Sequence, residues 1–152
     1  LTDGAARLTF RAMSSRFASG PFAVSVLVLP GASLMTVASV LEPWRALNRV
    51  APEAGAEWRV LSLDGGPVAL SSGLPFPVQG RLAAAMTGDL LAVVGGIDAA
   101  GHARPALGTL RLLLRRFGRV AGIESGAWVL GAIGALEGRR ATAHWEDLED
   151  FQ

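Results

Sequence analysis

The segment Gly122-Ile-Glu-Ser-Gly-Ala-Trp contains the residue types and spacing in this chain that best suit chemistry. An apolar strand end is followed by one charged side chain, Glu124, and then by small residues that open an apolar helix. This order is typical of a nucleophile elbow, a sharp strand-to-helix turn that holds its central residue in strained backbone. The pattern therefore predicts that Glu124 stands at the mouth of a crevice.

Two interpretations of Glu124 follow from that position. An acid between a buried strand and an apolar helix suits a counter-ion for a cationic effector. Alternatively, its carboxylate accepts local backbone amides as a helix cap, because acids are favoured at helix N-termini. The two roles are compatible, and Glu124 is the leading ligand-binding candidate.

Ser125, Gly95 and Gly96 are the next candidates, because the two glycines end another apolar strand. Their backbone amides are expected to meet an anionic or carbonyl group of the ligand, as the donors of an oxyanion hole do. The alternative is a purely steric need for small residues in tight turns.

Aromatic residues beside these motifs suggest the chemistry of the ligand. The chain has four tryptophans and no tyrosine, and Trp44, Trp128 and Trp145 lie in or next to motif segments. Tryptophan faces bind quaternary ammonium groups well, so we expect one or more rings to join Glu124 around a cationic amine or amino-acid-like compound. The alternative for each ring is packing in the core or in a dimer interface.

The two histidines give weaker signals. His144 could hydrogen-bond an effector or the elbow, but a structural role is favoured because no second histidine or nearby acid forms a catalytic or metal set with it. His102 lies in a Gly/Ala/Pro stretch that we interpret as an exposed loop. We expect no metal and no cofactor.

The composition excludes several classes of chemistry. The absence of cysteine removes disulfides, thiolate metal sites and cysteine nucleophiles, and all 14 basic residues are arginine, so no lysine can form a Schiff base. With 13 acidic residues the net charge is only +1, which is no basic footprint for nucleic acid.

The elements that must position these residues follow from hydrophobic periodicity. Apolar runs predict strands at 22–29, 58–63, 90–94 and 120–123, with a further short strand at 68–70 and a loop at 71–77. Helical patterns predict helices at 34–49, capped by Ser33 and kinked or restarted by Pro43, at 106–117 and at 127–136.

This order of elements predicts an α/β fold, a parallel-sheet sandwich with helices on both faces. Ligands in such sheets bind beyond the carboxyl ends of the strands. Pro30-Gly31, Gly95-Gly96 and Glu124-Ser125 all fall at such ends, so they are expected to converge on one crevice.

The uncharged segment 17–41 raises the question of a membrane span. Its Gly20-Pro21 and Pro30-Gly31 pairs divide it into a strand and a helix, so we expect no membrane segment. No secretory signal is evident, and the expected compartment is the cytoplasm. Residues 1–20 form an N-terminal extension in this interpretation.

Several segments together resemble a known family. They are the 41–49 stretch LEPWRALNR, LSLDGGPV at 61–68, SGLP at 72–75, Gly95-Gly96, the elbow, and LEGRRATAHW at 136–145. Over about residues 22–150 the chain resembles the class I glutamine amidotransferase-like (PfpI-type) N-terminal sensor domain of AraC-family, GlxA-like transcriptional regulators.

The resemblance implies a flavodoxin-like three-layer α/β/α fold for residues 21–152. Enzymes of that superfamily carry a cysteine at the elbow and often a histidine beyond the next helix, and these positions match Glu124 and His144. Glu124 cannot supply a thiolate, so the resemblance implies an effector-sensing and dimerising domain without catalysis.

In that family a C-terminal helix-turn-helix domain binds DNA, usually in dimers. None of that region is among these 152 residues, so DNA contact is expected only through a domain beyond them. Two other interpretations stay open: a hydrolase or hydratase using Glu124 and His144, and a structural dimerisation module without a ligand.

Overall fold

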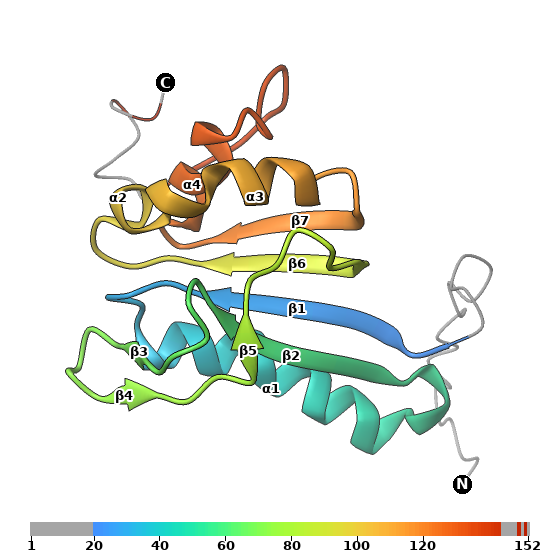
Figure 1. Cartoon of the computed structure of the whole chain (residues 1–152). Helices are drawn as coiled ribbons and strands as arrows, with labels where there is room; N and C mark the ends of the chain where they lie inside the picture. Colours follow the sequence, from blue (N-terminus) through green and yellow to red (C-terminus); the bar gives the residue numbers. More distant parts are fainter. Residues whose placement is uncertain (1–19, 144–148, 150, 152) are drawn as a thin grey trace, which may run out of the picture.

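The computed structural model describes residues 20–143, 149 and 151 and is built on one parallel sheet (Figure 1). Its strands lie in the order β5-β2-β1-β6-β7, and every paired neighbour is parallel. They are β1 (Phe22–Val28), β2 (Ala56–Ser62), β5 (Gly80–Arg81), β6 (Gly88–Val94) and β7 (Phe117–Ile123). A separate two-stranded antiparallel ribbon joins β3 (Val68–Ala69) to β4 (Pro75–Phe76).

Helices cover both faces of the sheet (Figure 1). The long helix α1 (Leu34–Val50) lies beside β1 and β2, whereas α2 (Ala99–Ala103), α3 (Leu107–Leu113) and α4 (Gly126–Ala132) gather over β6 and β7. Two short 3₁₀ turns, Pro52–Ala54 and Arg104–Ala106, complete the connections. The predicted three-layer α/β/α architecture is confirmed.

The alternation of side chains along β1 explains why there are two cores. Val24, Val26 and Val28 pack with Val37 of α1 on one face of the sheet. Leu27 and Leu29 point to the other face, where they join Val129 of α4 and its neighbours. A strand that is buried on both faces has a nearly continuous run of apolar residues, and this run allowed β1 to be predicted from the sequence.

Helix α1 differs from its prediction in two details. Ser33 is the N-cap residue, but its side chain makes no capping hydrogen bond. Pro43 lies inside the helix, which continues through it to Val50. The predicted cap interaction is therefore wrong, and the predicted element is right.

The boundaries of the later elements differ more. The helix predicted for 106–117 ends at Leu113, and Phe117 begins β7 instead. The Phe117 ring is buried beside Gly88 at the start of β6, where a β-carbon on that glycine would lie 2.7 Å from the ring. Burial of the ring at the sheet edge thus overrides the helical spacing.

Other local predictions were also incomplete. Helix α4 ends at Ala132 rather than at 136. Gly134, two residues after its end, adopts a left-handed φ of 76°. The predicted loop at 71–77 contains β4, and neither β5 nor α2 was predicted. The short strands β4 and β5 depend on their pairing partners more than on their own residues.

No helix of the described residues is long and apolar enough to cross a membrane. The N-terminal extension predicted for residues 1–20 falls outside the described residues except for Gly20.

Candidate functional site

The elbow predicted at Glu124 is present at the carboxyl end of β7. Glu124 follows the last residue of that strand and has a φ of 56°, in the left-handed region. Such backbone costs a residue with a β-carbon about 1–2 kcal/mol, so the surrounding structure must hold it. The Glu124 carbonyl accepts the Ala127 amide at 3.3 Å, which starts the turn into α4. The predicted strain is confirmed.

The Glu124 side chain reaches across to the first turn of α1. The hydroxyl of Thr36 donates a hydrogen bond to Glu124 Oε2 at 3.0 Å, joining residues 88 positions apart. A negative charge is favourable beside this end of a helix. Sequence reasoning missed Thr36, although the helix predicted for 34–49 follows Pro30-Gly31, which was expected at this edge of the sheet.

Three chain segments converge at this edge, as predicted. Ala32 forms an isolated bridge with Gly96, and the Ser125 hydroxyl donates to the Gly96 carbonyl oxygen. The Gly31 amide donates to Ala69 at 2.9 Å, which attaches the β3–β4 ribbon to the same edge. The loops that follow β1, β6 and β7 therefore form one connected surface around Glu124.

The expectation that Gly95 offers its amide to a ligand is not met. That amide donates to the carbonyl oxygen of Ile123 at 3.2 Å, and the Ser125 hydroxyl is engaged with Gly96. A β-carbon at Gly95 would overlap the backbone of Gly126, and one at Gly96 would overlap Gly31. The steric alternative thus fits both glycines, while the donor role expected of the Gly96 and Ser125 amides stays a prediction.

Of the predicted aromatic residues, Trp44 lies away from the elbow. Trp44 stacks on Phe22, with ring centroids 5.6 Å apart. Phe22 begins β1 whereas Glu124 follows the end of β7, and six residues of parallel strand span roughly 20 Å. Trp44 therefore lies toward the opposite end of the sheet, in the hydrophobic cluster under α1.

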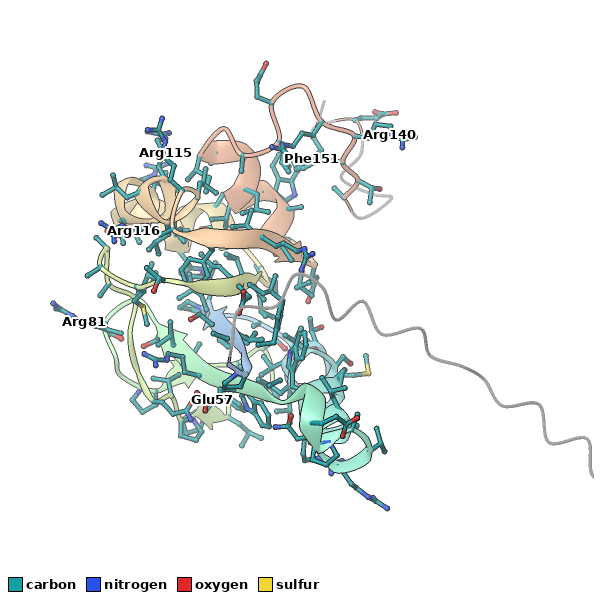
Figure 2. The ribbon with its side chains drawn as sticks, turned by 90° about the vertical axis from the view of Figure 1, so that its right-hand side faces the viewer. Glu57, Arg81, Arg115, Arg116, Arg140 and Phe151 are labelled. Carbon is teal, nitrogen blue, oxygen red and sulfur yellow. The ribbon has the colours of Figure 1, made fainter. Side chains whose placement is uncertain are left out.

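Trp128 lies in α4, two residues after the start of the helix. Its ring meets Phe151 edge-on, with centroids 5.0 Å apart, and Phe151 is labelled in Figure 2. His144 and Trp145 lie outside the described residues. His102 is exposed as expected, but it belongs to the short helix α2 rather than to a loop.

Glu124 has no cationic partner among the described residues. The one ion pair they form is Arg45 with Glu42, at 2.6 Å on the surface of α1. The same residues contain no group of three His, Asp or Glu that could hold a metal ion. The Glu124 carboxylate is therefore exposed, accepts one hydroxyl, and forms no ion pair with any arginine of the described residues.

Comparison with known proteins identifies the class of protein to which this fold and elbow belong. Residues 24–151 match the DJ-1/PfpI family, and the chain belongs to that family. The PfpI-type resemblance seen in the sequence is confirmed.

The relatives that share this domain include transcriptional regulators. The chain is 44% identical over 127 residues to the HTH-type transcriptional regulator CdhR of Pseudomonas aeruginosa, covering 83% of this chain and 38% of the regulator. It is 35% identical over 125 residues to the HTH-type transcriptional regulator GlxA of Rhizobium meliloti, covering 81% of this chain and 39% of that protein. The chain thus spans less than two fifths of the length of these regulators.

A solved structure agrees with this relationship. The crystal structure of an AraC family transcriptional regulator from Pseudomonas putida superposes with a TM-score of 0.76 at 25% sequence identity. The match covers 86% of this chain and 71% of that chain. The domain is therefore one that homologous regulators contain.

Proposed function

We propose that this chain is the effector-sensing and dimerising domain of an AraC-type transcriptional regulator in the cytoplasm, and that it performs no catalysis. The regulator relatives support the first part, and their greater length leaves room for the helix-turn-helix region that their names mention. Effector binding would shift the population of dimer geometries and so reposition DNA-binding domains.

The chemistry of the elbow supports the absence of catalysis. The chain has no cysteine to serve as the nucleophile that the superfamily's enzymes use, and Glu124 stands at the elbow instead. The Ser125 hydroxyl is held by the Gly96 carbonyl, and no described histidine contacts it. An unassisted carboxylate or serine is a weak nucleophile.

The single observation that carries the effector class is the exposed Glu124 carboxylate at the ligand-binding edge of a parallel sheet. Because no described cation neutralises it, a cationic group of the ligand would meet an available negative charge. The effector proposed is accordingly a cationic amine or amino-acid-like compound, with Trp128 the described ring on the helix that follows the elbow.

A thermal-shift screen tests this proposal, because a ligand that binds only the folded state raises Tm. The panel contains tetramethylammonium, free amino acids, polyamines and small carboxylates. We expect a saturable rise in Tm with the cations and its loss in Glu124→Gln. The control is Glu57→Gln, which should leave the shift intact. Glu57, labelled in Figure 2, is an exposed acid at the start of β2, where it pairs with Ala23 toward the opposite end of the sheet.

The other outcomes contradict the proposal. A shift with carboxylates alone, or an unchanged cation shift in Glu124→Gln, would exclude the counter-ion role. No shift with any class would support a structural module. If NMR showed that the protein converts a bound compound to a product, the chain would be an enzyme. Sedimentation of the chain as a monomer at micromolar concentration would contradict dimerisation by this domain.

A further inference from the structure

Thr36 stands where α1 meets the elbow. It is the third residue of α1 and is half-buried, while Glu124 is exposed. Its hydroxyl reaches Glu124 Oε2 at 3.0 Å, although the two elements are separated by β2 and β6 in the sequence. The contact is therefore created by the fold and not by local sequence.

Both ends of Glu124 are held by different parts of the protein. The backbone is held at the left-handed φ of 56° between β7 and α4, and the carboxylate is held by α1. A glutamate side chain free in solvent samples many rotamers, and ordering it costs conformational entropy. A carboxylate that is already positioned binds its partner more tightly, since less of that entropy is lost on binding.

The two carboxylate oxygens have different surroundings. Oε2 accepts the Thr36 hydroxyl, whereas Oε1 accepts no hydrogen bond from the described residues. We infer that Thr36 is a positioning residue of the effector site: it holds Oε2 so that Oε1 is presented to the cationic group of the ligand. This inference rests on the counter-ion role proposed for Glu124.

Variants at Thr36 separate this role from packing. Thr36→Val keeps the shape of the side chain without the hydroxyl, and Thr36→Ser keeps the hydroxyl. With tetramethylammonium as the probe in calorimetry, Thr36→Val should bind roughly threefold to tenfold more weakly than wild type. Thr36→Ser should retain wild-type affinity, a rescue that a role in packing would not give.

A matched control lies one helical turn away. The Ser39 hydroxyl donates to the Met35 carbonyl within α1, so Ser39→Ala removes a hydroxyl from the same helix without touching Glu124. It should leave the affinity unchanged. Wild-type affinity in Thr36→Val would overturn the inference.

A second measurement does not depend on a ligand. A double-mutant cycle on Tm with Thr36→Val and Glu124→Ala should be non-additive if the hydroxyl and carboxylate interact. Additive changes would overturn the inference whatever the ligand. If tetramethylammonium fails to bind wild type while the cycle is non-additive, the counter-ion proposal fails. The role of Thr36 in an effector site is then overturned with it, and only the hydrogen bond between Thr36 and Glu124 stands.

Discussion

A β-carbon on Gly126 would overlap the carbonyl oxygen of Val93 on the neighbouring strand β6. Helix α4 therefore begins in direct contact with the backbone of the sheet. This contact brings the elbow against the loop that follows β6, where Ser125 donates to Gly96. The position of Glu124 thus depends on a glycine two residues further along the chain.

Gly126→Ala should lower the free energy of unfolding by about 3 kcal/mol, because rigid backbone on both sides must move to admit one methyl group. Gly108→Ala is the matched control: nothing lies within 4 Å of a β-carbon there, and the residue is inside α3. Alanine in that helix should raise stability by about 0.5–1 kcal/mol. Urea unfolding measures both, and equal effects would contradict the close approach at Gly126.

The left-handed backbone of Glu124 predicts an order of stability among its variants. Glu124→Gly and Glu124→Ala both remove the carboxylate that Thr36 binds, but only glycine relieves the unfavourable φ. The glycine variant should therefore be more stable than the alanine variant by about 1 kcal/mol. Chemical denaturation checks the order, and an alanine variant of equal or greater stability would argue against strain at the elbow.

Asn48 connects the end of α1 to the start of β2. Its side-chain amide donates to the Ala56 carbonyl and accepts the Ala56 amide, each at 2.7 Å. Asn48→Ala should cost about 1–3 kcal/mol, since both backbone groups lose their partner.

Asn48→Asp should be worse at neutral pH, because a carboxylate would face the Ala56 carbonyl oxygen. It should recover below about pH 4, where the protonated acid can donate. Thermal unfolding at pH 7 and pH 3.5, with wild type at both, is the measurement. A pH-independent difference from wild type would show that the side-chain donor is unimportant.

Asp64 gives a prediction about pH. The Gly66 amide and then the Ser62 hydroxyl lower the pKa of its carboxyl below the ordinary value of 3.8. The carboxyl is ionised more easily in the folded state, so its contribution is present above that value and is lost as pH falls through the lowered pKa. Wild-type stability should therefore fall below about pH 4 more steeply than that of Asp64→Asn. Parallel slopes in acid titrations of stability would contradict this.

Local sequence patterns were sufficient to predict those elements whose conformation depends mainly on their own residues. The continuous apolar runs in β1 and β6 predicted buried parallel strands, and the small residues around Glu124 predicted a strained turn before a packed helix. Both patterns follow from backbone sterics and burial, which neighbouring residues in the sequence determine.

Contacts between distant elements required the fold. The sequence placed Trp44 near a ligand, but the direction in which α1 runs carries it toward the other end of the sheet. It predicted that the Gly95 amide binds a ligand, but in the folded protein that amide donates to the Ile123 carbonyl oxygen. Helix α3 ends at Leu113, before the predicted 117, because the Phe117 ring is buried at the start of β7.

The sequence by itself determined the class of fold, the elbow at Glu124 and the absence of thiol and lysine chemistry, because composition and periodicity are properties of the chain alone. Only the tertiary structure decided that Thr36 donates to Glu124. It also decided that the Gly95 amide and the Ser125 hydroxyl donate to carbonyl oxygens of the protein's own backbone. Such contacts depend on strand order and register, which set where each helix begins relative to its neighbours.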